Sequence, residues 1–213
     1  MTMRLHGYWR SSAAYRVRIA LNLKGLAYDQ QVYDLRTGAQ REPAYLAIAP
    51  QGLVPALEAN GQVLTQSLAI MEWLEETHPA PALLPTDAEG RAVVRAMSAL
   101  ISSDIHPLGN LRVLQALRHR FGADQAAVED WAAHWITEGF EALETLIVRH
   151  GAGFSYGDTP TMADCCLLPQ AYNAQRYRVD LGRFPRVRDA VERAKALPAV
   201  QAAAPEQQPD AGA

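Results

Sequence analysis

The chain has 213 residues, of which 49% are hydrophobic and 20% are charged, and its formal net charge at pH 7 is -3. This composition is typical of a globular protein with enough chain for two small domains, and the small negative charge creates no field that would attract nucleic acid or an anionic membrane. No apolar run approaches the ~18 residues of a membrane span and no signal-peptide pattern opens the sequence, so we expect a cytoplasmic protein.

The first part of the chain alternates strand and helix patterns. Gly25 provides a stop for the first helix, Asn60-Gly61 is the typical turn of a tight hairpin, and Ser67 can cap the helix that follows. The order βαβαββα predicts an α/β domain over residues 1–83. The expected elements are a strand over 3–9, a helix over 13–25, a strand over 27–35, a short helix over 42–50, a hairpin over 53–66 and a helix over 67–79.

The strand patterns stop after a stretch rich in proline, which predicts a linker over 84–89. The remainder, 90–213, is expected to form an all-helical domain. The last twelve residues, 202–213, show no periodicity and are expected to be frayed or to lie along the surface. The helices expected in this domain span 90–120, 124–149, 161–176 and 184–197.

Two features of the helical domain predict structure rather than chemistry. Thr161 and Asp164 have the spacing of a capping box, in which each side chain bonds the other residue's backbone N–H. Cys165 and Cys166 are adjacent within an apolar run, so they are poorly placed to bridge each other and offer no metal-ligand pattern. The sequence therefore predicts buried thiols and no metal site.

Ser11 and Ser12 follow Arg10 at the point where a strand ends and a helix begins. Free backbone N–H groups and the helix dipole favour anions at such a position. A hydroxyl group there can donate to a thiolate and lower the pKa of the thiol. The alternative is that one serine only caps the helix, so the pair predicts either a helix cap or a thiol-activating site.

The same domain offers two further features that suit a peptide ligand. Pro55 interrupts an apparent strand, and a cis bond after Val54 would leave the backbone N–H and C=O of Val54 available for pairing. Gln66 and Ser67 open a helix after a strand, which is a second position that favours anions. Together with Ser11 these features predict a site for an extended, acidic peptide that carries a thiol.

Five segments of the chain, "RSSAAYRVRIAL", "LVPAL", "QSLAIMEWLEE", "DIHPLGNLRVL" and "GDTPTMADCCLLPQ", resemble the zeta class of glutathione S-transferases in the same order and spacing, from about Arg4 to Pro209. The class includes maleylacetoacetate and maleylpyruvate isomerases. The resemblance implies a thioredoxin-like N-terminal domain that binds glutathione, an all-α C-terminal domain and a homodimer. In one departure, Ala13 replaces the cysteine of the usual Ser-Ser-Cys pattern; that cysteine is not the class's indispensable nucleophile.

The resemblance also implies roles for individual residues. Ser11, with its neighbours Ser12 and Arg10, matches the catalytic position, and Ser11 is the thiol-activating serine. The implied glutathione contacts are Ser11, Ser12, Gln40, Val54, Pro55, Gln66, Ser67 and His106, and the implied substrate contacts are Arg10, Asn110, Arg112 and Arg176.

A chemical mechanism follows from these expected roles. A glutathione thiolate that adds to a conjugated alkene makes the double bond single, so that rotation followed by expulsion of the thiolate gives the trans isomer. Three arginines suit the carboxylates of a dianionic keto acid, and His106 and Asn110, four residues apart, are expected on one helical face.

We therefore expect a glutathione-dependent isomerase of maleyl keto acids in aromatic or tyrosine catabolism. The alternatives are a general conjugating or α-haloacid-dehalogenating transferase and a non-catalytic glutathione-binding protein.

Overall fold

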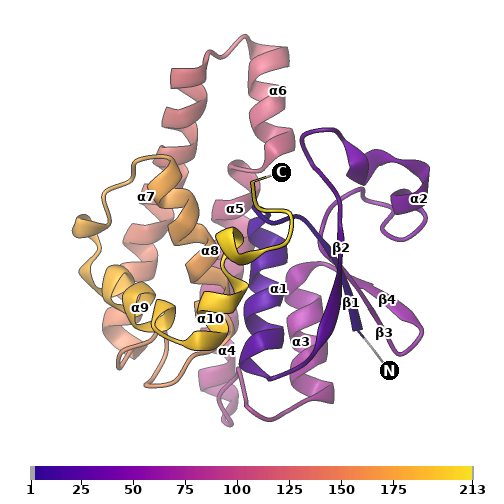
Figure 1. Ribbon diagram of the computed structural model, residues 1–213. Coiled ribbons are helices and arrows are strands. Elements are labelled where there is room, and N and C mark those ends of the chain that lie inside the picture. The colour runs from indigo at the N-terminus through magenta and orange to yellow at the C-terminus, as the bar shows by residue number, and fades with distance from the viewer. Residues whose placement is uncertain (1–2, 213) are drawn as a thin grey trace. The chain divides into compact units, whose positions relative to one another are not determined.

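The computed structural model of the chain describes residues 3–212. It divides into two compact units (Figure 1): unit 1 comprises Met1–Leu83 together with Lys195–Ala213, and unit 2 comprises Leu84–Ala194. The helices and strands are β1 (Met3–Gly7), α1 (Ser12–Leu23), β2 (Tyr28–Val32), α2 (Pro43–Leu46), β3 (Ala56–Ala59), β4 (Gln62–Thr65), α3 (Ser67–Thr77), α4 (Ala88–Ala99), α5 (His106–Leu108), α6 (Leu111–Phe121), α7 (Gln125–His150), α8 (Met162–Arg176), α9 (Pro185–Lys195) and α10 (Pro198–Ala203).

Unit 1 contains a four-stranded sheet of order β2-β1-β3-β4. The β1 and β2 strands are parallel, whereas β3 is antiparallel to both β1 and β4. The hairpin turns at Asn60 and Gly61 as predicted, and both residues have positive φ values, 52° and 76°. Helices α1 and α3 pack against each other beside the sheet (Figure 1). This mixed sheet with flanking helices is the thioredoxin-like arrangement that the sequence predicted.

The C-terminal segment folds onto the rest of unit 1, so of the two expectations for residues 202–213, frayed or lying along the surface, the described part agrees with the second. Helix α10 packs against α1, and the yellow C-terminal stretch runs beside that helix in Figure 1. Arg18, only 1% exposed, donates from Nε to the Ala203 carbonyl (3.0 Å), and Asn22 donates to the Ala199 carbonyl (3.0 Å). Burial lowers the pKa of Arg18 to about 10. These two bonds join α1 to α10 within unit 1.

A buried ion pair lies at the end of α1 in unit 1. Lys24 Nζ donates to Glu75 Oε2 (2.7 Å) and to the carbonyls of His78 (2.8 Å) and Pro81 (2.9 Å). Glu75 Oε2 also accepts the Leu83 backbone N–H (2.9 Å). Both charged side chains are almost entirely buried, and all three N–H bonds of the ammonium group therefore have partners. The pair joins the ends of α1 and α3 to the segment that leaves the domain.

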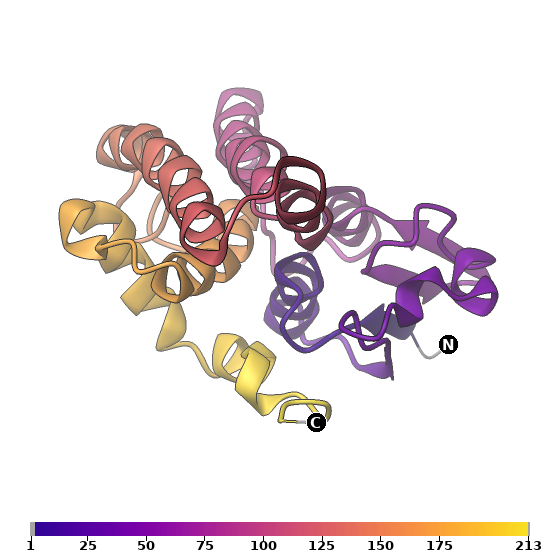
Figure 2. The same ribbon diagram turned by 90° about the horizontal axis from the view of Figure 1, so that it is seen from above.

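Unit 2 is all-helical, as predicted. Helices α6 and α7 lie side by side (Figure 2), and α4 packs against α8. Phe140 and Phe184 meet edge to face, with ring centroids 5.8 Å apart. The capping box at the start of α8 is also confirmed, because the backbone N–H of Thr161 donates to Asp164 Oδ2 (2.7 Å). Burial raises the pKa of the Asp164 carboxyl, while hydrogen bonds from Ser155 and Thr161 oppose that shift.

The single helix expected over 90–120 is instead broken in the structure. Helix α4 runs into a π-helical segment, Leu100–Ile105, and the chain then makes the short helix α5 before Gly109 ends it. Pro107 has no backbone N–H and cannot continue a regular hydrogen-bond ladder. Asn110 starts the next helix, because its Oδ1 accepts the Arg112 backbone N–H (3.2 Å).

Gly139 allows the π-helical segment to approach α7. It is a buried position where an added Cβ would overlap the side chain of Ile105. We expect Gly139→Ala to destabilise the protein by about 1 kcal/mol, since overpacking costs about 1–3 kcal/mol and the gain in helix propensity offsets about 1 kcal/mol. Urea unfolding would measure the loss. Adding Ile105→Val should recover part of it, and an unchanged or increased stability of Gly139→Ala would contradict this packing.

Candidate active site

The first helix begins with the two serines that the sequence singled out. Ser11 is the N-cap of α1, and its Oγ accepts the Ala14 backbone N–H (3.3 Å). A hydroxyl group has one proton to donate besides its acceptor lone pairs, so the Ser11 O–H can still donate to a ligand. Ser11 is half-buried, whereas Ser12 lies in the first turn and is only 8% exposed. Ser11 therefore serves as a helix cap and remains able to act as a donor.

The loop before Ser11 is held by the C-terminal segment. Trp9 donates its backbone N–H to Asp210 Oδ2 (2.9 Å), and Arg18 donates from Nη2 to the Trp9 carbonyl (2.8 Å). The guanidinium of Arg10 lies over the Trp9 ring, 5.4 Å from its centroid. Residues from opposite ends of the chain thus fix the backbone that leads into the two serines.

Asp210 provides a direct test of this bracing. We expect Asp210→Ala to lower stability by about 1 kcal/mol, the usual contribution of one hydrogen bond, and to lower turnover several-fold by loosening the segment before Ser11. Thermal unfolding and steady-state kinetics would measure the two effects. Asp210→Asn keeps an acceptor oxygen and serves as the matched control. Equal behaviour of Asp210→Ala and the wild type in both assays would rule out the bracing role.

The segment around Gln40 lies close to the loop before β3. Gln40 belongs to a short 3₁₀ turn, Ala39–Arg41, and its Oε1 is buried with no hydrogen-bond partner within residues 3–212. Gly52 has φ +60°, and a Cβ there would lie 2.9 Å from the Gln40 carbonyl oxygen. Glycine at this position therefore permits the close approach, and the Gln40 side chain keeps an unused acceptor.

The backbone of Val54 is supported from behind by an aromatic cluster. The Val54–Pro55 bond is cis. Tyr45 is fully buried, and its hydroxyl donates to the Leu53 carbonyl (2.8 Å) while its ring lies 4.3 Å from that of Tyr33. Burial raises the pKa of Tyr45 well above its ordinary value, so this hydroxyl stays protonated and continues to donate.

The start of α3 differs from the prediction. Gln66, not Ser67, is the N-cap residue, and it has an unusual backbone conformation with φ 68°. The Gln66 side chain donates from Nε2 to Gln51 Oε1 (2.6 Å). Ser67 is buried, and its Oγ accepts a hydrogen bond from Arg16 Nη1 (3.2 Å). The Ser67 hydroxyl is therefore engaged by a buried cation and makes no capping bond.

The remaining predicted site residues belong to unit 2. His106 opens α5 and Asn110 precedes α6, so the break at Gly109 removes the single helical face that was expected for them. Trp131 Nε1 donates to the Leu108 carbonyl (2.9 Å) and so fixes the turn between the two helices. Arg112 and Arg176 are both exposed, and the Arg176 guanidinium lies 5.3 Å from the centroid of the Tyr177 ring.

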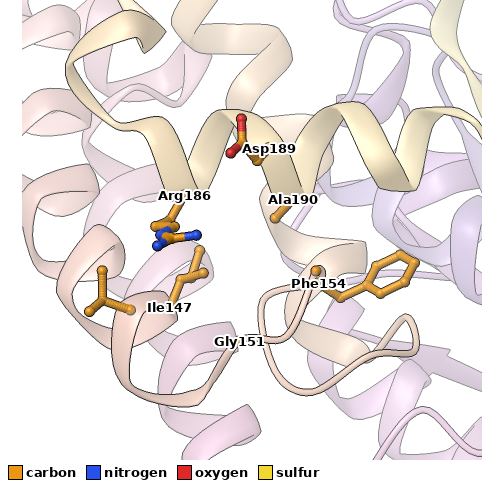
Figure 3. Close-up of a pocket in the computed structure, with 8 residues that line it drawn as sticks. Ile147, Gly151, Phe154, Arg186, Asp189 and Ala190 are labelled. Carbon is orange, nitrogen blue, oxygen red and sulfur yellow. The ribbon is translucent and has the colours of Figure 1, made fainter.

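A small cavity of about 150 Å³ lies elsewhere in unit 2, between the end of α7, the loop after it and α9 (Figure 3). None of the predicted site residues lines it. Within residues 3–212, no group of three or more His, Cys, Asp or Glu side chains could hold a metal ion, and no helix has the length and apolar character needed to cross a membrane. The residues that line the cavity are Ile147, Val148, Gly151, Gly153, Phe154, Arg186, Asp189 and Ala190.

Sequence reasoning missed several residues that support the site. Arg16 and Tyr45 lie one layer behind Ser67 and Val54, and Gln51 contacts Gln66 directly. A signal existed for Arg16, because the helix around it has apolar residues on every side and an interior position was therefore implied. No comparable signal marks Tyr45 or Gln51.

Comparison with known proteins agrees with this geometry. The chain matches the N-terminal domain of glutathione S-transferases over residues 10–77 and the C-terminal domain over residues 125–200. A maleylpyruvate isomerase from a Ralstonia species is 48% identical over 211 residues, which cover 98% of this chain and 99% of that protein. A holo structure of a maleylpyruvate isomerase, a bacterial zeta-class glutathione S-transferase, has a TM-score of 0.96 at 47% identity and covers 98% of this chain and 100% of that one.

A further solved structure carries ligands in its active site. The maleylacetoacetate isomerase from Anaeromyxobacter dehalogenans 2CP-1, with bound dicarboxyethyl glutathione and citrate, has a TM-score of 0.89 at 46% identity and covers 100% of this chain and 98% of that one. The chain therefore belongs to the glutathione S-transferases and, within them, to the zeta class of maleylacetoacetate and maleylpyruvate isomerases. The family and the fold predicted from the sequence are confirmed.

Proposed function

We propose that this protein is a glutathione-dependent cis-trans isomerase that converts maleylacetoacetate or maleylpyruvate into the fumaryl isomer. One observation carries the proposal: Ser11 caps α1 through its acceptor oxygen and keeps its O–H proton for a ligand. The near-full-length similarity to a maleylpyruvate isomerase supports the choice of substrate class.

Unit 1 would bind glutathione as an extended peptide. Ser11 donates to the thiolate, and the α1 N-terminus adds a favourable dipole. The backbone of Val54, before Pro55, pairs with the cysteinyl residue, and Gln40 contacts the glycyl end. Ser12 completes the turn behind Ser11. Gln66 and Ser67 take the γ-glutamyl carboxylate.

The reaction itself needs only addition, rotation and elimination. The glutathione thiolate adds to one alkene carbon and forms a C–S bond, while the electron pair of the double bond moves into an enolate on the keto group. The bond between the two carbons is then single and rotates. Collapse of the enolate re-forms the alkene in the trans geometry and expels the thiolate, so atoms, charge and oxidation state are unchanged overall.

The substrate carries two carboxylates, and the chain offers arginines for them. Arg10, Arg112 and Arg176 supply planar guanidinium groups, which bind carboxylates through paired hydrogen bonds. Asn110 caps α6 through Oδ1 and keeps its amide N–H groups for the enolate or a carboxylate. The dicarboxyethyl glutathione held by the Anaeromyxobacter relative carries two carboxylates besides those of glutathione itself.

The setting of the reaction is also part of the proposal. We infer a homodimer that works in the cytoplasm on products of aromatic or tyrosine catabolism, as the class resemblance implies. Light scattering and sedimentation would determine the oligomeric state, with two copies expected and a single copy contradicting the dimer.

A substrate panel tests the proposal against its alternatives. Purified protein is assayed with maleylacetoacetate, maleylpyruvate, a chlorinated two-carbon acid and an aromatic conjugation substrate, each with and without glutathione. The proposal predicts the highest kcat/KM for one of the two maleyl acids. Preferential turnover of the chlorinated acid or the aromatic would favour the transferase alternative, and glutathione binding without any turnover would favour a binding protein.

A further inference from the structure

Arg16 is a buried cation that touches a residue of the proposed glutathione site. It lies in the second turn of α1, is 2% exposed, and donates from Nη1 to Ser67 Oγ (3.2 Å) at the start of α3. Both residues belong to unit 1 and are separated by 51 positions in the sequence. An arginine is almost never fully buried unless its charge is paired or hydrogen-bonded.

The hydrogen bond from Arg16 determines whether the Ser67 hydroxyl can donate to a ligand or accept from it. A guanidinium group can only donate, so the Ser67 oxygen is the acceptor. The hydroxyl then has its single proton left for an acceptor on its other side. Ser67 is the first residue of an 11-residue helix, where backbone N–H groups also favour an anion. A positive charge behind the hydroxyl makes it a stronger donor to a carboxylate.

Arg18, two positions along α1, shows what a structural arginine looks like in this fold. It is as deeply buried as Arg16, and its bonds run to the backbone carbonyls of Ala203, Tyr8 and Trp9. Those partners are fixed parts of the protein and need no ligand. One bond from Arg16, in contrast, ends on a hydroxyl group that the proposed function assigns to ligand binding.

We propose that Arg16 is a positioning residue for the γ-glutamyl carboxylate of glutathione and that its charge acts on this carboxylate through the Ser67 hydroxyl. The inference rests on the proposed function for the identity of the ligand. It adds a source of positive charge at this end of the peptide, behind the Ser67 hydroxyl.

The test compares two ligands that differ only in this carboxylate. Isothermal titration measures the Kd of glutathione and of γ-aminobutyryl-cysteinyl-glycine, which lacks it, for the wild type, Arg16→Gln and Ser67→Ala. The expected loss is about 10- to 100-fold for glutathione in both variants, the range for hydrogen bonds to charged groups, with little change for the analogue. The double variant should lose no more affinity for glutathione than either single variant, because the charge of Arg16 acts only through the Ser67 hydroxyl.

Controls separate this role from folding. Arg18→Gln is the matched variant: it also removes a buried guanidinium from α1, and it should leave the ratio of the two Kd values unchanged. Arg16→Lys keeps a charge and should retain part of the preference if Arg16→Gln fails to fold. An equal loss for both ligands in the Arg16 variants, or additive losses in the double variant, would overturn the inference. A wild type that binds neither ligand would instead contradict the proposed function.

Discussion

Replacing Ser11 with alanine is expected to lower kcat/KM for the isomerisation by about 100- to 1,000-fold, the usual loss when one donor to a reacting anion is removed. The Ser11 O–H is the group that stabilises the glutathione thiolate, and without it the thiol ionises less at neutral pH. Steady-state kinetics measures the rate. The ultraviolet absorbance of the bound thiolate, followed as a function of pH, should show a higher apparent pKa in the variant.

The capping role of Ser11 requires a control, because its Oγ also accepts the Ala14 N–H. Loss of an N-cap to alanine costs about 1 kcal/mol, whereas glycine at the same position costs only a few tenths. Ser11→Gly should therefore be nearly as stable as the wild type and as inactive as Ser11→Ala. A Ser11→Gly variant with near-normal turnover, or a larger loss in Ser12→Ala than in Ser11→Ala, would show that Ser11 is not the thiol-activating group.

Replacing Lys24 with methionine is expected to destabilise the protein by about 3–5 kcal/mol, since it leaves the Glu75 carboxylate buried without its partner. The change also removes the donor that serves the carbonyls of His78 and Pro81. Chemical unfolding in urea, followed by circular dichroism, gives the free energy of unfolding.

The double variant Lys24→Met with Glu75→Leu tests the electrostatic origin of this loss. Apolar replacement of both partners of a buried ion pair is often nearly neutral, so the double variant should recover much of the stability. A loss below about 1 kcal/mol in Lys24→Met alone would contradict the view that the ion pair stabilises unit 1.

The features that the sequence predicted correctly depend on neighbouring residues. The Asn60-Gly61 turn needs positive φ at two adjacent positions, and the Thr161–Asp164 capping box spans a single helical turn. Local chemistry is sufficient in both cases. The identification of Ser11 as a helix-start hydroxyl succeeded for the same reason.

The errors and omissions involve contacts between distant segments or competing local signals. The C-terminal segment is held by Arg18 and Trp9, about 185 and 201 positions away from their partners Ala203 and Asp210, and periodicity cannot reveal such bonds. The common helical face of His106 and Asn110 was lost because proline and an asparagine cap interrupt the helix between them. Ser67 was predicted as a cap because its partner Arg16 lies 51 positions away in the sequence, and nothing near Ser67 indicates their hydrogen bond.

The most direct test of the account is the isomerisation rate measured with glutathione, without a thiol, and with S-methylglutathione, which keeps the peptide but cannot form a thiolate. The account predicts that turnover requires glutathione and that S-methylglutathione binds, inhibits competitively and gives no turnover. Isomerisation supported by S-methylglutathione, or occurring at a comparable rate without any thiol, would contradict the addition of a glutathione thiolate to the substrate.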